Sequence, residues 1–300
     1  SFCSTLIMAV VRSASHAGSW YSDNSKELAN DFEYWLQQAD TERTPNVRAV
    51  IGPHAGYSYC GPTTAYAYKQ INPEQVKRVF LLGPSHHVAL RGIALSACDA
   101  YDTPFGQIPV DKEVVNKLAA AAPFKWMPME MDEADHCLEM HLPILKYVMG
   151  RQEFEIVPMI VGNTTPDVEE AFAKVLAPYF LDEKSLFVIS SDFCHWGERF
   201  GYMQYDTPCD VIGDGIEQLD RRGMAAIESG DVDEFYRYLD ETDNTICGRH
   251  PISILMQILR LVREQQEFRV TFNAYAQSSR VKTKRESSVS YAAAAVTALQ

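Results

Sequence analysis

Three short apolar runs of the chain share one layout, in which a loop bearing histidine follows the run. The runs cover residues 48–52, 78–83 and 185–191, and they are followed by His54, by His86 and His87, and by Asp192 and His195. An uninterrupted apolar run that ends at Gly, Pro or Ser is typical of a strand buried on both faces of a parallel sheet. A single histidine after such a strand is usually an ordinary surface residue. Histidine-bearing loops after three such strands predict one common site, because ligand crevices lie at the carboxyl ends of parallel strands.

The pattern between and after these runs predicts alternating helices and strands. Helices are expected from Asp23 or Ser25 to residue 36, then over 61–69, 111–122, 165–179, 206–229, 231–242 and from 251 to about 261. Further strands are expected at 92–97, 155–162, 270–276 and 289–299. This order predicts an α/β fold with a large, mostly parallel central sheet flanked by helices. No linker divides the chain, so we expect one domain over residues 14–300, preceded by an N-terminal extension at 1–13.

Composition narrows the classes of partner. The net charge of -13 and the pI near 5.1 argue against nucleic acid or an anionic membrane as the main partner. The run Leu6–Val11 is too short for a secretory signal, and no stretch is long enough to span a bilayer, so no membrane insertion is expected. Seven scattered cysteines without a Cys-x-x-Cys pair predict neither a disulfide framework nor a zinc ribbon. We expect a cytoplasmic protein, with the nucleus as a second location.

Residues 132–143 concentrate carboxylates and two histidines. Acidic residues at a helix N-terminus are a routine macrodipole arrangement, and this structural interpretation is preferred. On a helix His136 and Glu139 would share a face and His141 would not, so the three form no ready metal cage. A place for His136 or Glu139 near the site is the alternative.

Three other positions have both a structural and a functional interpretation. Asp192 and His195 are three residues apart, so on one helical turn Asp192 could orient His195, or Asp192 could cap the helix. Cys247 precedes a helix beside Arg249 and His250, an environment that lowers a thiol pKa, although a buried inert cysteine is the alternative. Trp20 precedes a helix and is either a core anchor or a pocket wall.

The motifs themselves resemble one family. Pro53–Tyr57, Gly83–His87, Ser190–Gly197, Thr245–Pro251 and Tyr275–Ser279 closely resemble Memo, the mediator of ErbB-driven cell motility, over residues 14–297. The resemblance implies a fold similar to the class III extradiol non-haem iron dioxygenases typified by LigB. It matches the metal-binding positions to His54, His86 and Cys247, with Asp192 and His195 lining the same pocket as candidate catalytic residues. Trp20 and Tyr57 match peptide-facing positions, and His87 and Arg249 complete the expected peptide or substrate pocket.

The third metal position departs from the dioxygenase pattern, since it holds the thiol of Cys247 in place of a carboxylate. Two imidazoles and a thiolate are a softer set, compatible with an iron or copper ion. A soft, oxidisable ligand favours a redox role over extradiol ring cleavage.

The first hypothesis is therefore a metal-binding redox protein of the Memo family, in which His195 acts as acid or base. The resemblance also implies signalling from receptor tyrosine kinases to the cytoskeleton, with a phosphorylated receptor tail peptide and Rho-type GTPase signalling as partners. A non-catalytic adaptor that binds a phosphotyrosine peptide in a degenerate dioxygenase cleft is the second hypothesis. An active non-haem iron dioxygenase is the third hypothesis, and a Cys247–His250 nucleophile pair is the fourth. The hypotheses therefore include both enzymes and a non-enzyme.

Overall fold

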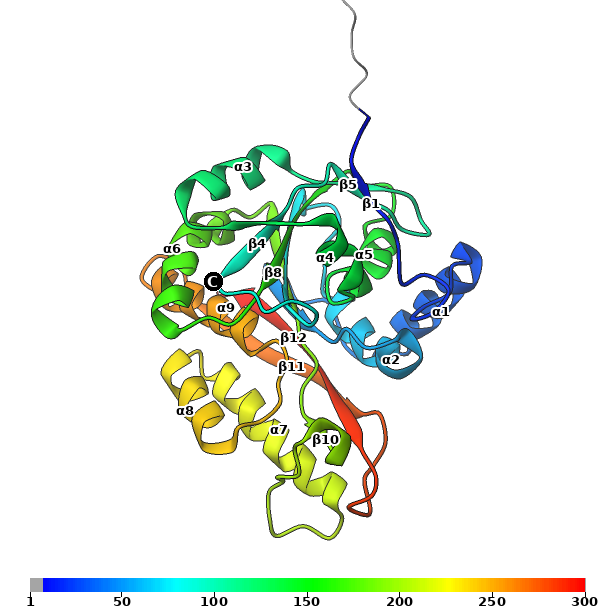
Figure 1. The fold of residues 1–300 in the computed structure, drawn as a ribbon, viewed down its shortest axis with the longest axis vertical. Coiled ribbons are helices and arrows are strands. Elements are labelled where there is room, and N and C mark those ends of the chain that lie inside the picture. Colours follow the sequence, from blue (N-terminus) through cyan, green and yellow to red (C-terminus); the bar gives the residue numbers. More distant parts are fainter. Residues whose placement is uncertain (1–7, 300) are drawn as a thin grey trace, which may run out of the picture.

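The computed structural model describes residues 8–299 as one α/β domain with a continuous hydrophobic core (Figure 1). The predicted apolar run at Leu6 begins outside the described residues. In the described part the α-helices are α1 Ser25–Gln38, α2 Tyr57–Tyr68, α3 Lys112–Ala121, α4 Met129–Ala134, α5 Leu142–Met149, α6 Pro166–Leu181, α7 Ile212–Glu228, α8 Val232–Thr242 and α9 Arg249–Val262. Short 3-10 turns occur at Glu139–His141 (η1) and Glu198–Phe200 (η2). No helix among residues 8–299 combines the length and the apolarity that a membrane crossing requires.

The strands form a nine-stranded sheet and a small three-stranded sheet. The strands of the large sheet are β2 Val47–Gly52, β3 Arg78–Pro84, β4 Ile93–Ser96, β7 Lys125–Met127, β8 Glu155–Val161, β9 Ser185–Ser190, β10 His195–Trp196, β11 Phe268–Gln277 and β12 Ser288–Ala298. The small sheet consists of β1 Val11–Arg12, β5 Ala100–Tyr101 and β6 Ile108–Pro109.

The large sheet is mixed, and its centre is parallel. In the order β10-β12-β2-β9-β3-β8-β4-β7, the four strands β2, β9, β3 and β8 run parallel to one another. Antiparallel pairs flank them, since β12 pairs with β2, β10 and β11, and β4 pairs with β8. The predicted α/β class is confirmed, with a larger antiparallel share than predicted. Of these pairs, β11 and β12 follow each other directly along the chain, through the connection at 278–287.

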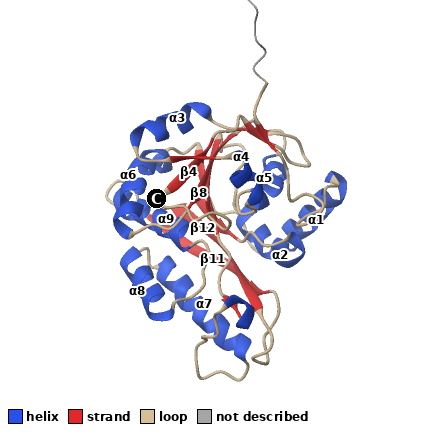
Figure 2. Ribbon diagram, viewed as in Figure 1, coloured by secondary structure: helices blue, strands red, loops and turns tan. Residues whose placement is uncertain are grey.

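Helices cover both faces of this sheet. Figure 1 shows α1, α2 and α5 on one side, where α2 packs on β2, β11 and β12, and α6 and α9 on the other, against β9. Figure 2 shows the same layering, with α7 beside β11 and α8 packed against α7 and α9. With both faces covered, every residue of β9 and nearly every residue of β2 and β3 is buried, which explains their continuous apolar runs.

The three strands that precede the predicted site lie side by side in the order β2-β9-β3, and their register aligns their ends. Gly52 pairs with Ser190, and Leu82 pairs with Ile189. The loops that follow the three strands therefore start at nearly the same level of the sheet.

The N-terminal strand is fastened to the domain by a buried arginine. Val11 and Arg12 of β1 pair with β5, inside the stretch expected to be an extension. The Arg12 guanidinium is fully buried, donates to Asp132 at 3.2 Å and forms an ion pair with Glu139. The segment from α4 to η1 is thereby fixed against the start of the chain.

Three local predictions were wrong. Helix α7 begins at Ile212, six residues later than predicted. Helix α2 begins at Tyr57, four residues earlier than predicted, because the Tyr57 N–H donates to the Trp20 carbonyl at 3.2 Å. Gly56 leaves room for that carbonyl, since a Cβ there would lie 3.3 Å from its oxygen. No helix spans Asp192 to His195, since Asp192 lies in a loop and His195 starts β10, where it pairs with Val289.

Candidate functional site

Three imidazoles meet beyond the carboxyl ends of the central strands. His54 and His86 each stand two residues after their strand, and His136 joins them from the loop between α4 and η1. One ligand atom from each of the three lies within 4.8 Å of the others. The ring centroids are 5.0 Å apart for His54 and His86, and 4.7 Å apart for His86 and His136. We call His54, His86 and His136 the imidazole cluster.

The tautomer of His54 follows from the hydroxyl of Ser190. That hydroxyl has one hydrogen, which it donates to the Cys137 carbonyl at 2.8 Å. It must therefore accept from Nδ1 of His54, at 2.6 Å, and from Nε2 of His141, at 2.8 Å. Nε2 of His54 is left with a free lone pair, and burial holds the pKa of His54 well below its usual range, so the ring is neutral.

His86 is oriented by a carboxylate clamp. One oxygen of Asp135 accepts the His86 backbone N–H at 2.8 Å, and the other accepts Nδ1 at 3.0 Å. Burial alone would raise the pKa of Asp135, but the hydrogen bonds and charge of His86 outweigh it and lower the pKa well below its usual value. Because Nδ1 donates to a carboxylate, Nε2 is the nitrogen of His86 that holds the lone pair in the neutral ring.

The position of His136 corrects the preferred interpretation of residues 132–143. The residue lies between α4 and η1, so it shares no helix face with Glu139. Its ring stacks on Trp20 with centroids 4.2 Å apart and stands 5.3 Å from the ring of His54. Burial, with a contribution from His86, lowers the pKa of His136 to about 4, so this imidazole is also neutral at pH 7.

Cys247 adjoins the cluster through His54. Its Sγ lies 3.2 Å from Nε2 of His54, and the Asp192 backbone N–H donates to Sγ at 3.2 Å. The thiol is not among the described groups of three ligands within 4.8 Å, because the third member beside His54 and His86 is His136. The expected lowering of its pKa was wrong: burial raises the pKa of Cys247, and the carboxylate of Asp192 adds to the increase.

Asp192 and His195 lie near each other, but Asp192 does not orient His195. Asp192 accepts the His54 backbone N–H at 2.9 Å. Nδ1 of His195 lies 2.9 Å from the Phe193 carbonyl and 3.1 Å from that of Thr245. Since carbonyls only accept, Nδ1 of His195 carries a hydrogen, and in the neutral ring Nε2 holds the lone pair.

The four expected pocket residues do not share one pocket. Trp20, 38% exposed, lines a cavity of about 400 Å³ with Ala55, Gly56, Tyr59, Arg199 and Tyr291. Tyr57 is only 3% exposed and donates to the Met140 carbonyl at 2.6 Å, so it is a core residue. His87 is exposed, with its ring 6.4 Å from that of His136. Arg249 lines another pocket, with Glu169, Tyr236 and His250.

Sequence reasoning missed three residues that shape the site: Asp135, Ser190 and His16. Ser190 and Asp135 hold the rings of His54 and His86, and His16 stands edge-on to Trp20 and His136. A signal existed for Ser190, the last polar residue of a His-bearing strand. No local pattern indicates that Asp135 pairs with a histidine 49 positions earlier.

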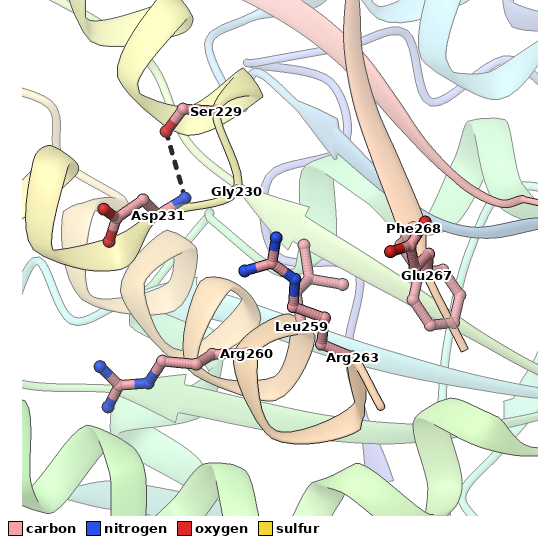
Figure 3. Close-up of a pocket in the computed structure, with 8 residues that line it drawn as sticks. All are labelled: Ser229, Gly230, Asp231, Leu259, Arg260, Arg263, Glu267 and Phe268. Atoms are coloured by element: carbon pink, nitrogen blue, oxygen red, sulfur yellow. Dashed lines mark hydrogen bonds between the residues drawn. The ribbon is translucent and has the colours of Figure 1, made fainter. Parts of the chain in front are cut away.

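The concave surface in Figure 3 lies elsewhere. This pocket of about 530 Å³ is lined by the joint of α7 and α8 and by Arg260 and Arg263 near the end of α9, whereas Cys247 precedes the start of that helix. Among its labelled residues are two arginines and two acids, but no histidine or cysteine. It offers none of the chemistry of the imidazole cluster.

The donor set of the cluster fits a metal ion. Neutral imidazole is the commonest protein metal ligand, and the outer nitrogens of His54 and His86 are bound by a hydroxyl and a carboxylate, the usual second contacts of ligating histidines. The residues therefore could hold a metal ion, with Cys247 adjacent.

Comparisons with known proteins give the family. The Memo-like protein family model matches residues 12–295. The chain is 46% identical to Protein MEMO1 of Xenopus laevis over 96% of its own length and 98% of the relative's, and 45% identical to Protein MEMO1 of Homo sapiens over the same shares. It is 46% identical to the Protein memo-1 homolog of Caenorhabditis elegans, over 94% of this chain and 81% of the relative.

A crystal structure of an uncharacterized protein from Escherichia coli K12 has a similar fold, with a TM-score of 0.51 and 13% identity, over 82% of this chain and 99% of that one. At this identity the likeness concerns the fold alone. The match of the family model to nearly the whole chain and the relatives at 45–46% identity show that the chain belongs to the Memo-like protein family.

Proposed function

We propose that this protein binds an iron or copper ion beside the imidazole cluster and acts as a cytoplasmic redox protein. The observation that carries the proposal is that hydrogen bonds at Nδ1 fix the rings of His54 and His86 and leave each Nε2 as the ligand atom. The buried His54 ring is already neutral, so it needs no proton loss before it binds a metal at pH 7.

Two residues compete for the third ligand position. Cys247 has the chemistry that the family resemblance implies, and its Sγ touches Nε2 of His54. His136 offers a ligand atom within 4.8 Å of those of both other imidazoles and is already neutral. We propose His54, His86 and Cys247 as the metal ligands, with His136 as the competing donor, because a thiolate adds negative charge that offsets the charge of the ion.

Residues around the ligands supply positioning and proton acceptance. The lone pair of Nε2 in His195 can accept a proton from a bound ligand, while the Phe193 and Thr245 carbonyls hold the ring. Trp20 covers His136 and restricts access of water to the cluster. An iron or copper ion bound there would supply one-electron redox chemistry.

The signalling part of the proposal rests on the family resemblance. We propose a phosphorylated receptor tyrosine kinase tail peptide as a partner, with an effect on Rho-type GTPase signalling and cell motility. The acidic surface expected from the net charge of -13 would favour a basic or neutral partner segment.

A non-catalytic adaptor is the second candidate, and one cavity favours it. Trp20, Tyr59 and Tyr291 line the 400 Å³ cavity beside the cluster, and exposed Arg199 lies at the same cavity. Aromatic walls with an arginine suit a phosphotyrosine side chain. Arg199, rather than Arg249, is the residue that lines this cavity beside Trp20.

Elemental analysis of protein prepared without chelators tests the metal proposal. We expect about one iron or copper ion per chain in the wild type and almost none in His54→Ala or His86→Ala. Cys247→Ser and His136→Ala identify the third ligand, since the variant that loses the larger share of the metal removes it. Cys209→Ser, a half-buried thiol outside the site, is the matched control and should keep wild-type content.

Binding of a phosphotyrosine peptide to the same proteins separates the two candidates. Equal binding by metal-free wild type and His54→Ala, with loss only in Arg199→Ala, would favour the adaptor. Absence of iron and copper from wild-type protein after reconstitution would refute the metal centre.

A further inference from the structure

At each of three histidines near the site, the backbone N–H donates to a buried carboxylate of its own. The backbone N–H of His16 donates to Glu139 at 2.8 Å, that of His54 to Asp192 at 2.9 Å, and that of His86 to Asp135 at 2.8 Å. In His16 and His86 the second carboxylate oxygen also binds Nδ1, at 2.8 Å and 3.0 Å. His16 is therefore held in the same way as a proposed metal ligand.

Glu139 is a well-anchored acceptor. The carboxylate is fully buried, pairs with Arg12 and accepts the Tyr21 hydroxyl at 2.7 Å. An ionised carboxylate cannot donate, so the hydrogen between it and His16 resides on Nδ1. In the neutral imidazole Nε2 of His16 is then the unprotonated nitrogen, and no residue among 8–299 hydrogen-bonds that nitrogen.

His16 lies close enough to the imidazole cluster for its Nε2 to contact a ligand held there. The ring stands 5.8 Å from Trp20 and 6.0 Å from His136 between centroids, at the rim of the imidazole cluster. The ring of His16 is farther from His136 than the rings of His54 and His86 are, at 5.3 Å and 4.7 Å, so His16 lies at the edge of the cluster. Its free lone pair can accept a hydrogen from a ligand held at the cluster.

We propose that His16, clamped by Glu139, is a further ligand-contacting residue of this site, which accepts a hydrogen bond from an N–H or O–H group of the bound ligand. The ligand class is a small chelating molecule with a hydrogen-bond donor beside its metal-binding atoms. The proposal rests on the metal site proposed above, and its first test is independent of metal.

The first test is the tautomer of His16 in metal-free protein. Long-range proton–nitrogen NMR correlations of protein labelled at its histidines, assigned with His16→Gln, should show Nδ1 protonated and Nε2 unprotonated for His16. A protonated Nε2 would overturn the proposal, whether or not metal binds.

The second test uses two probes that differ in one donor. Acetohydroxamate bound to a metal keeps an N–H, and N-methylacetohydroxamate does not. In metal-loaded protein we expect His16→Phe to weaken acetohydroxamate binding by about tenfold and to leave the N-methyl probe unchanged. His16→Gln, whose amide oxygen can accept the same hydrogen bond, should restore most of the affinity.

Metal content and thermal midpoint of each variant show whether the change is local. Equal weakening of both probes, or loss of metal in His16→Phe, would refute the ligand contact and make His16 a structural residue or a metal ligand. If wild-type protein takes up no metal, the proposed metal centre fails, and the tautomer decides whether His16 offers an acceptor at this site.

Discussion

At the residue scale, the positions of the hydrogens in the site follow from hydrogen-bond partners whose role as donor or acceptor is fixed. Ser190 has one hydrogen and gives it to a carbonyl, so both imidazoles that touch its oxygen must donate to it. Nε2 of His54 is consequently an acceptor, and Sγ of Cys247 lies 3.2 Å from it.

Metal uptake should therefore release a proton. Because burial raises the pKa of Cys247, the thiol is protonated at pH 7 without metal, and ligation as thiolate releases about one proton per ion. His54 contributes none, since its pKa lies well below neutrality. Affinity should fall as the pH falls, because protons compete with the ion for the sulfur. Calorimetric titration with metal in two buffers of different ionisation enthalpy measures the release.

Cys247→Ser should bind metal more weakly and release almost no proton, whereas Cys60→Ser, a buried thiol that hydrogen-bonds the Ala55 carbonyl, serves as control. Unchanged proton release in Cys247→Ser would mean that the sulfur is not a ligand.

At the element scale, the start of α9 is pressed against the end of β9. A Cβ on Gly248 would lie 2.4 Å from the Ser190 carbonyl oxygen and 2.4 Å from Cβ of Ser191. That closeness lets Cys247 reach the ring of His54, which follows the neighbouring strand β2. The approach of one helix to one strand end thus completes a site whose parts lie 193 residues apart.

Gly248→Ala should disrupt this approach, because backbone atoms cannot yield as a flexible side chain does. We expect a loss of about 2–3 kcal/mol in the free energy of unfolding, together with weaker metal binding. Gly52→Ala is the control: its Cβ would lie 3.5 Å from Cε1 of His141, an ordinary contact, and its effect should stay within about 1 kcal/mol. Urea denaturation of both variants measures the difference, and equal stability would contradict the close packing.

At the scale of the whole molecule, a buried carboxyl group links distant parts of the fold. Asp220 of α7 accepts from Cys194 N–H at 3.2 Å, from Asn244 Nδ2 at 2.9 Å and from the Tyr275 hydroxyl at 2.8 Å. These partners lie after β9, before α9 and on β11. Burial raises the pKa of Asp220 to about 6, although the hydrogen bonds partly offset the increase.

The raised pKa predicts how global stability depends on pH. The folded state keeps the Asp220 proton up to about pH 6, whereas the unfolded chain loses it near 3.8. Because the folded state binds more protons in this interval, Asp220 lowers stability as the pH rises through it, by roughly 3 kcal/mol in total. Asp220→Asn should remove that component, so the variant's stability should decline less than the wild type's between these pH values. Urea denaturation measures the free energy of unfolding at each pH, and an equal decline with pH in the two proteins would contradict the prediction.

Much of the fold could be predicted from local pattern. The three His-bearing strands, the helices between them and the α/β class depend on periodicity and turn residues within short windows, and α3, α6 and α8 lie within a few residues of their predicted bounds. The helical turn considered for Asp192 and His195 does not form, because His195 pairs with β12. A pairing partner nearly a hundred residues away leaves no mark on the local sequence.

By itself the sequence determined the class of the fold, its family, and the edge of the sheet where His54 and His86 would meet, because parallel strands always place their carboxyl ends together. Only the tertiary structure decided that His136 joins them, that Tyr57 is buried, and that the pKa of Cys247 rises where its neighbours in sequence predicted a decrease. These outcomes depend on burial and on hydrogen-bond partners far away along the chain, which exist only once the chain has folded.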